Sequence, residues 1–351
     1  MFNEMRSYFR RLAEGCETGS LATILCPVTE VISKIYHFSV RTVRALYEKK
    51  ILKRKRLPFP VVSVGNLTWG GTGKTPVVEY LARRVGERRR NVLILTRGYS
   101  HDEINQMKHH LPHVGIGVGK NRYRVGKRLG KKTRYDLAIL DDGFQHFPIE
   151  RDIEIITVNC LNPFGNGKLI PRGILREPVS VLQKAAIIVM THVNLVRPKE
   201  LQELKTRLQS LAPEAFIVES YLEPLFFYRA KKRSRVSISK LQNQRVTTFS
   251  AVGVPRSFQL LLSQYQIRPI RNFEFTDHHQ FSKGELEEIK EISASASASE
   301  IITTEKDFYR CPDLITETLN PLVLATRLRI ASGEEVLTDR LFHLLGVTPR
   351  W

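Results

Sequence analysis

Residues 61–85 read VVSVGNLTWGGTGKTPVVEYLARRV, and this stretch decides the fold that we expect. VVSV has the apolar composition of a short buried strand, and the residues after Lys74 have the spacing of a helix. The tract between them ends in Gly-Lys-Thr, as a phosphate-binding P-loop requires. Backbone N–H groups of such a turn surround phosphates, and the dipole of the following helix adds to the attraction. The tract predicts a nucleotide site formed by Thr68, Trp69, Gly70, Gly71, Thr72, Gly73, Lys74 and Thr75.

One position departs from the P-loop consensus, because Thr68 stands where the consensus has its first glycine. The strand, loop and helix in this order nevertheless favour a P-loop over a purely structural glycine turn. In a P-loop the lysine, here Lys74, contacts the β- and γ-phosphates of the nucleotide. The hydroxyl of the following residue, Thr75, binds Mg²⁺.

A further apolar run, DLAIL, ends in the carboxylate pair Asp141-Asp142. A buried strand that presents an acid at its carboxyl end is the Walker B pattern of P-loop proteins. An acid pair at a strand end can also be a turn or a helix cap. With a P-loop upstream, metal binding by at least one of Asp141 and Asp142 is the better interpretation, and the sequence leaves open which one.

Other apolar runs alternate with helical patterns such as PKELQELKTRLQSL, which predicts an α/β protein with a mostly parallel, helix-covered sheet of the P-loop NTPase type. A length of 351 residues favours two domains. We expect an N-terminal membrane-associating helix and basic segment (1–56), a P-loop kinase domain (57–225), a hinge (226–237) and a smaller C-terminal α/β domain that closes the active-site cleft (238–351).

The chain has 55 lysines and arginines against 35 acidic residues, a net charge of +20, which predicts an anionic partner. Residues 21–40 are mostly apolar but contain Pro27, Glu30 and Lys34, and central charges are costly in a membrane. Basic residues follow between 41 and 56. This combination suits a helix on the cytoplasmic, anionic side of a membrane. A helix packed on its own domain stays an alternative, and whether 21–40 spans the membrane or lies on it stays open.

Seven tracts, in this order, closely resemble the tetraacyldisaccharide 4′-kinases (lipid A 4′-kinases): VGNLTWGGTGKTP, RGY, LDDGFQH, RDIEI, FGNGKLIPRGILREP, TDHHQF and TTEKD. The resemblance implies a bacterial enzyme at the cytoplasmic face of the inner membrane. It would use ATP and Mg²⁺ to phosphorylate the 4′-hydroxyl of a tetraacylated glucosamine disaccharide 1-phosphate. Its partners would be this lipid and the anionic membrane surface, with neither a nucleic acid nor an obligate protein partner.

The same resemblance aligns Asp102 with the family's catalytic base and implies that His278 is the partner of that base. The connection before Asp102 is shorter than in the family, and His101 replaces a glycine. From the residues alone, Asp102 could instead be a helix-capping acid and His278 an ordinary loop histidine. Gln145 also matches the family. Substrate-binding or supporting roles are implied for His146, Arg176, Glu177 and Asp277.

Two other functions stay open at this point. A P-loop kinase of a soluble sugar or metabolite would keep the nucleotide site without the membrane. A nucleic-acid-dependent P-loop ATPase would explain the charge differently, but the sequence has no helix-turn-helix, zinc-finger or RNP-type signature. The cysteines are scattered and form no CxxC pair, which argues against a zinc site.

Overall fold

The computed structural model describes Ala13, residues 20–98 and residues 101–346, without the side chains of 20–24 and His101. Most of the expected segment before residue 20, and Tyr99 of the RGY tract, lie outside these residues. The chain forms two compact units. The first consists of Met1–Gly98, His113–Tyr221 and Ile330–Trp351, and the second of Tyr99–Pro112 and Leu222–Arg329. Compared with the domain ranges expected from the sequence, 99–112 group with the second unit and 330–351 with the first.

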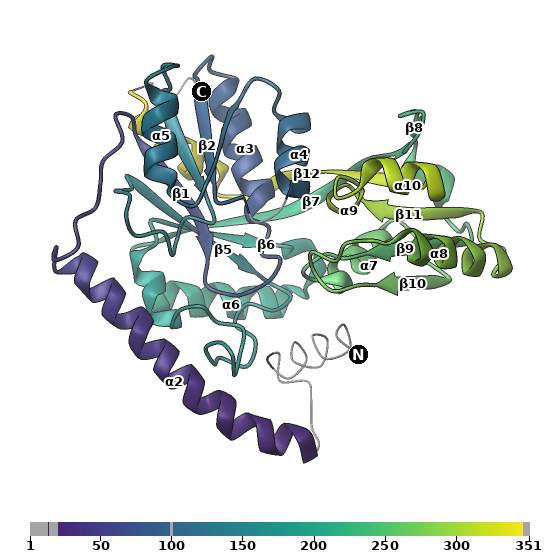
Figure 1. Cartoon of the computed structure of the whole chain (residues 1–351), viewed down its shortest axis with the longest axis horizontal. Helices are drawn as coiled ribbons and strands as arrows, with labels where there is room; N and C mark the ends of the chain where they lie inside the picture. The colour runs from purple at the N-terminus through teal and green to yellow at the C-terminus, as the bar shows by residue number, and fades with distance from the viewer. Residues whose placement is uncertain (1–12, 14–19, 99–100, 347–351) are drawn as a thin grey trace. The chain divides into compact units, whose positions relative to one another are not determined.

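The first unit contains a sheet in the order β7-β6-β5-β1-β4-β2-β3, and every strand pair in it is parallel. Strands β1, β2, β5, β6 and β7 of this sheet are labelled in Figure 1. Every residue of β1, β2, β4 and β6 is buried, which is typical of a parallel sheet covered by helices. The expected mostly parallel α/β fold is therefore confirmed. The strands are β1 (Val61–Asn66), β2 (Val92–Thr96), β3 (Gly115–Val118), β4 (Leu137–Asp141), β5 (Ile153–Asn159), β6 (Ile187–Thr191) and β7 (Phe216–Arg229), whose last residues belong to the second unit.

The helices of the first unit include the two that the sequence pattern predicted best. Helix α3 begins at Lys74, within the P-loop tract, and α6 spans the whole PKELQELKTRLQSL tract. Helix α3 packs against β1, β2 and β4, and α5 against β2 and β3. The helices are α2 (Ser20–Glu48), α3 (Lys74–Gly86), α5 (Arg122–Gly130), α6 (Pro198–Leu211) and α11 (Glu334–Leu344), with short 3₁₀ turns η1 (Val179–Lys184) and η2 (Val193–Leu195).

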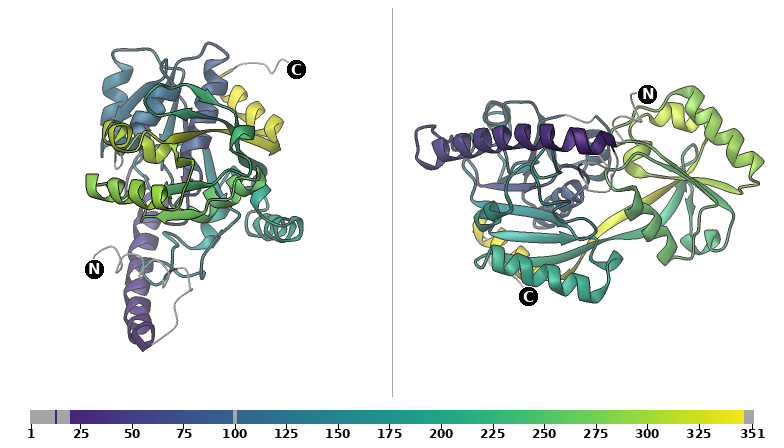
Figure 2. Two further views of the ribbon diagram at one scale, coloured as in Figure 1. Left: turned by 90° about the vertical axis from the view of Figure 1, so that its right-hand side faces the viewer. Right: turned by 90° about the horizontal axis from the view of Figure 1, so that it is seen from below.

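Helix α2 confirms the expected N-terminal helix but is longer than expected. It continues without interruption past Val40 to Glu48 (Figure 2), although Pro27 lies inside it. The assignment of Arg41 and Arg44 to a basic segment after the helix was therefore wrong, because both belong to its last turns. Among the described residues, no helix combines the length and the apolar character needed to cross a lipid bilayer.

In the second unit the strand order is β10-β9-β11-β12-β7, and β8 pairs antiparallel with the end of β7. The expected hinge, residues 226–237, therefore lies in a β-hairpin. The capping box of Ser282 and Glu285 is present at the start of α8. The elements are β8 (Arg235–Val236), β9 (Val246–Ser250), β10 (Arg271–Glu274), β11 (Glu300–Thr304), β12 (Leu322–Ser332), α4 (His101–His110), α7 (Pro255–Gln264), α8 (Lys283–Ser295), α9 (Glu305–Phe308), α10 (Pro312–Thr318) and η3 (Ile238–Leu241).

Candidate active site

The P-loop tract connects β1 to α3 in the first unit, as the sequence predicted. Gly73 precedes the helix with φ 76°, a left-handed conformation that favours glycine, so Lys74 and Thr75 form the first turn of α3. A Cβ atom at Gly73 would lie 3.1 Å from Cγ2 of Thr191. Thr68 is buried, whereas the Trp69 side chain is largely exposed. The tract thus has the turn and the helix N-terminus that a phosphate site needs.

Polar side chains at the ends of β1, β5 and β6 form hydrogen bonds with the P-loop. Asn159 Nδ2 donates to the carbonyl oxygen of Gly71 (3.1 Å), and Thr191 Oγ1 donates to that of Thr72 (3.1 Å). Asn66 Nδ2 donates to the Thr72 hydroxyl (2.9 Å). Loop carbonyls bonded to the protein leave the loop's N–H groups to face a phosphate. Sequence reading missed this support, although polar residues ending buried apolar strands were a visible signal.

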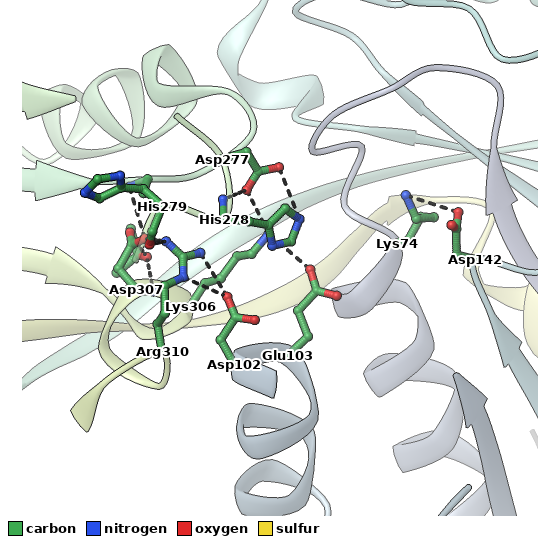
Figure 3. Close-up of polar contacts among 12 residues, drawn as sticks. Lys74, Asp102, Glu103, Asp142, Asp277, His278, His279, Lys306, Asp307 and Arg310 are labelled. Carbon is green, nitrogen blue, oxygen red and sulfur yellow. Dashed lines mark hydrogen bonds and ion pairs between the residues drawn. The ribbon is translucent and has the colours of Figure 1, made fainter. Parts of the chain in front are cut away.

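The two Walker B carboxylates differ in their surroundings. Asp141 ends β4 and is buried. Asp142 follows with φ 51° and lies 3.5 Å from Lys74 Nζ (Figure 3), while Arg176 Nη1 donates to its carboxylate oxygens at 2.9 and 3.0 Å. Arg122 donates to the Asp142 carbonyl oxygen. Burial alone would raise the pKa of Asp142, but Lys74 and Arg176 outweigh it and hold the pKa below its usual range.

The donor set near the P-loop suits Mg²⁺. Within the described residues, no three or more His, Cys, Asp and Glu side chains gather as a metal site of their own. Mg²⁺ usually takes one or two carboxylates together with substrate phosphates and water, and it prefers hard oxygen ligands. Thr75, Asp141 and Asp142 offer a hydroxyl and two carboxylates of this kind, so the residues present fit the ion.

The expected supporting residues His146 and Glu177 lie in the same unit. Burial, followed by the charges of Arg122, Arg151 and Arg97, lowers the pKa of His146 to about 4, so its ring is neutral at neutral pH. The Glu177 side chain has no exposed surface. His146 belongs to the DDGFQH tract, which contains Asp141 and Asp142, and Glu177 accepts a hydrogen bond from Gln145 of the same tract.

In the second unit, Asp102 lies in the first turn of α4 and is buried. Its carboxylate accepts two hydrogen bonds from Arg310, from Nε at 3.1 Å and from Nη2 at 2.9 Å (Figure 3). Arg310 also donates to Asp307 at 3.3 Å. All three side chains are almost completely buried. Asp102 thus belongs to a buried ion-pair group and is more than a helix-end acid.

Lys306 links the tract that contains Asp102 to the tract that contains His278. Its Nζ lies 3.1 Å from Glu103 Oε1 and 3.2 Å from Asp277 Oδ1. His278 is half exposed, has φ 63°, and places Nε2 3.7 Å from Asp277 Oδ2. Burial opposes the charge on Lys306, but Glu103 and Asp277 outweigh it and raise its pKa. The fold therefore gathers the expected base and its expected partner in one charged cluster.

The sequence did not predict a role for several residues of this charged cluster. Glu103 adjoins Asp102, and Lys306 and Asp307 belong to the TTEKD tract, but none had been given a role. Arg310 follows that tract by one helical turn. The available signal was a run of charged residues directly after an apolar strand, here β11.

Comparisons with known proteins agree with this geometry. The family model described as tetraacyldisaccharide-1-P 4′-kinase matches residues 24–345. A "probable tetraacyldisaccharide 4′-kinase, mitochondrial" from Arabidopsis thaliana is 34% identical, with 92% of this chain and 90% of the relative covered. A tetraacyldisaccharide 4′-kinase from Halothermothrix orenii is 31% identical, with 88% of each chain covered.

A solved structure is also similar over nearly the whole chain. The crystal structure of LpxK from Aquifex aeolicus in complex with ATP has a TM-score of 0.67 and 25% identity, and the match covers 92% of this chain and 99% of that one. The resemblance found in the sequence tracts is confirmed. With its P-loop, its paired strand-end acids and a family match over most of its length, the chain belongs to the tetraacyldisaccharide-1-P 4′-kinase family.

Proposed function

We propose that the protein transfers the γ-phosphate of ATP to the 4′-hydroxyl of a tetraacylated glucosamine disaccharide 1-phosphate, a step of lipid A biosynthesis. The observation that carries the proposal is the family match over residues 24–345. It is supported by a P-loop whose Lys74 lies beside Asp142 at the end of a buried strand. The ATP-bound LpxK of similar structure supports ATP as the phosphate donor.

On the nucleotide side, the P-loop N–H groups and Lys74 bind the phosphates. Thr75, Asp141 and Asp142 would hold Mg²⁺, and the bound ion would neutralise charge on the phosphate oxygens. Phosphoryl transfer has a loose transition state, so positioning and charge neutralisation account for most of the catalysis. Arg176 keeps Asp142 in place through its hydrogen bonds to both carboxylate oxygens.

On the acceptor side, the sugar hydroxyl must lose a proton, and Asp102 accepts it. The two hydrogen bonds from Arg310 fix the orientation of this carboxylate. His278 acts as its partner from the neighbouring tract, where Lys306 holds Asp277. Asp277 in turn accepts a hydrogen bond from the His278 backbone N–H at 3.1 Å.

We further propose that the enzyme binds the anionic cytoplasmic surface of the inner membrane through helix α2 and the basic residues after it. The side chains that support this proposal form an exposed apolar row on α2: Val28, Val31, Ile32, Ile35, Phe38 and Val43. An apolar helix face beside basic residues binds anionic lipid surfaces. Ile35→Glu with Phe38→Glu should therefore release the protein from anionic vesicles in sedimentation. Thr206→Glu, which adds a charge at an exposed polar position of α6, away from α2, should not release it. Equal loss in both variants would contradict this proposal.

The direct test of the activity uses γ-labelled ATP, Mg²⁺ and the acylated disaccharide 1-phosphate, with thin-layer separation of the lipid product. Label in the lipid supports the proposal. The same disaccharide without acyl chains separates the alternatives, because equal use of both acceptors would favour a kinase of soluble sugars. Labelling of neither acceptor would contradict the proposed function.

A further inference from the structure

The inner face of α2 is attached to the long segment between β5 and β6. Ser33 Oγ donates to the carbonyl oxygen of Leu169 at 2.9 Å, and both atoms are buried. Glu30 lies 3.3 Å from Lys168 Nζ and 3.9 Å from Arg172 Nε. The segment that receives α2 continues directly to Arg176 and Glu177, the LREP tract of the sequence.

Arg44 makes the most buried of the ion pairs between α2 and this segment. Its Nε donates to Glu177 Oε2 at 2.8 Å, and its Nη2 contacts the same oxygen. The guanidinium lies over the rings of Phe144 (5.0 Å) and Phe147 (4.9 Å). The Arg44 side chain is 13% exposed and that of Glu177 is 0% exposed. Because a buried carboxylate without a partner is costly, Glu177 depends on Arg44 to keep its place.

A continuous series of hydrogen bonds leads from Glu177 to the Walker B acid. Gln145 Nε2 donates to Glu177 Oε1 at 3.2 Å. Arg176 Nη1 donates to Gln145 Oε1 at 3.4 Å and to both carboxylate oxygens of Asp142. Asp142 in turn faces Lys74. Every step joins side chains of the first unit, and the series connects a residue of α2 to the P-loop lysine.

We propose that Arg44 is a positioning residue for the phosphate site. By fixing Glu177 it fixes Gln145 and Arg176, and so sets where Asp142 presents its carboxylate to Lys74 and to the metal of the nucleotide. The packing of α2 against the segment between β5 and β6 then affects the geometry of the phosphate site. The proposal rests on the proposed kinase function for the identity of the nucleotide, but the contacts that carry it are independent of the acceptor.

The test compares three variants of the full chain by calorimetric titration with Mg²⁺-ATP and by turnover. Substitutions in the supporting shell of a metal site typically cost about 10–100-fold in affinity or activity. We expect Arg44→Ala to weaken Mg²⁺-ATP binding and turnover in this range and to raise the Mg²⁺ concentration for half-maximal rate. Arg44→Lys, which keeps the charge but loses the paired contact, should recover part of the loss. Arg41→Ala removes the same charge from the exposed side of α2 and should bind Mg²⁺-ATP like the wild type.

A double substitution tests the relay itself. If Arg44 acts through Gln145, Arg44→Ala with Gln145→Ala should be scarcely worse than the poorer single variant, because residues that act as a unit are not additive. Fully multiplicative losses would overturn the relay. Wild-type Mg²⁺ dependence in Arg44→Ala, or an equal defect in Arg41→Ala, would overturn the role of Arg44.

The role of Arg44 can still be tested if Arg44→Ala does not fold or if the proposed function is wrong. If Arg44→Ala does not fold, Arg44→Lys and Glu177→Gln, which keep the size of the side chains, take its place under the same criteria. If the wild type binds Mg²⁺-ATP but labels no lipid, the proposed function fails, while the calorimetric comparison of Arg44 and Arg41 variants still decides the positioning role.

Discussion

The phosphate site and the acid cluster of Asp102 are built in different ways. The phosphate site is built on one contiguous loop, Thr68–Thr75, and later segments add Asp142, which faces Lys74 and Arg176. The acid cluster joins residues far apart, such as Asp102 and Arg310, which are separated by 208 positions. In this cluster two cations, the buried Arg310 and the partly exposed Lys306, are each shared between two carboxylates. The phosphate site thus starts from one contiguous loop, whereas the surroundings of Asp102 come entirely from tertiary contacts.

The largest effect should come from the contiguous site. Lys74→Ala and Thr75→Ala should each lower phosphoryl transfer by at least about 10²–10³-fold, because they remove groups that contact the phosphates and their metal. The fold should persist, since neither side chain belongs to the hydrophobic core. Turnover with the acylated substrate, beside circular dichroism of each variant, measures both. Normal turnover in either variant would refute the P-loop assignment.

The assembled cluster should give a second, distinct kinetic signature. Asp102→Asn keeps the size of the side chain but removes the base, so kcat should fall by about 10²–10⁴-fold while KM for ATP stays nearly constant. His278→Ala should do the same, and the double variant should be little worse than the poorer single one. Steady-state kinetics on the three variants decide the matter. A nearly wild-type Asp102→Asn would show that the alignment across the shortened RGYSHDE connection is wrong.

The charged cluster around Asp102 should also contribute to the free energy of unfolding. Arg310→Leu leaves the buried carboxylates of Asp102 and Asp307 without their cation, and loss of one partner of a buried pair costs about 3–5 kcal/mol. Urea unfolding should show a loss of this size. Lys232→Ala, at an exposed position of the same unit, should change the free energy of unfolding by less than about 0.5 kcal/mol. Equal midpoints for the two variants would mean that the ion pairs do not hold the cluster together.

The smallest effect concerns His192, next to the Thr191 that supports the P-loop. Burial lowers the pKa of His192 to about 4, below the ordinary value of 6.5. Between these values the unfolded chain binds more protons, so stability falls as pH decreases through this range. From pH 7 to pH 5 this histidine should account for about 2 kcal/mol.

His192→Asn provides the matched comparison, because asparagine tolerates the left-handed φ of 61°. Urea midpoints of the wild type and the variant at the two pH values isolate the contribution of His192 from that of other histidines such as His146. If the wild type and His192→Asn lose the same free energy of unfolding between pH 7 and pH 5, burial does not lower the pKa of His192 in the folded protein.

The sequence predicts the elements that have local signals better than the contacts between distant segments. The P-loop, the strand before it and α6 could be located because their signals are local patterns of apolar residues and glycine. Arg44 shows the limit. Its place in a basic run suggested contact with a membrane surface, yet its side chain lies against Phe144 and Phe147 and pairs with Glu177. Periodicity alone does not reveal that a charged residue on a helix has a buried partner elsewhere.

The acid cluster was predictable only in part and only through resemblance. The family tracts named Asp102, Asp277 and His278, but no spacing in the sequence indicates that Lys306 and Arg310 hold them. Ion pairs between distant segments depend on which loops the sheet brings together. The same holds for the domain ranges, since residues 99–112 group with a unit whose other residues begin at Leu222.

The central claim is the transfer of phosphate to one particular hydroxyl, and the position of the new phosphate tests it most directly. The lipid product made with ATP, Mg²⁺ and acylated disaccharide 1-phosphate can be analysed by phosphorus–proton correlation NMR. Our account predicts a new phosphomonoester coupled to the proton on C4′ of the distal glucosamine, with the 1-phosphate unchanged. A new phosphate on another hydroxyl, or a diphosphate at C1, would contradict it.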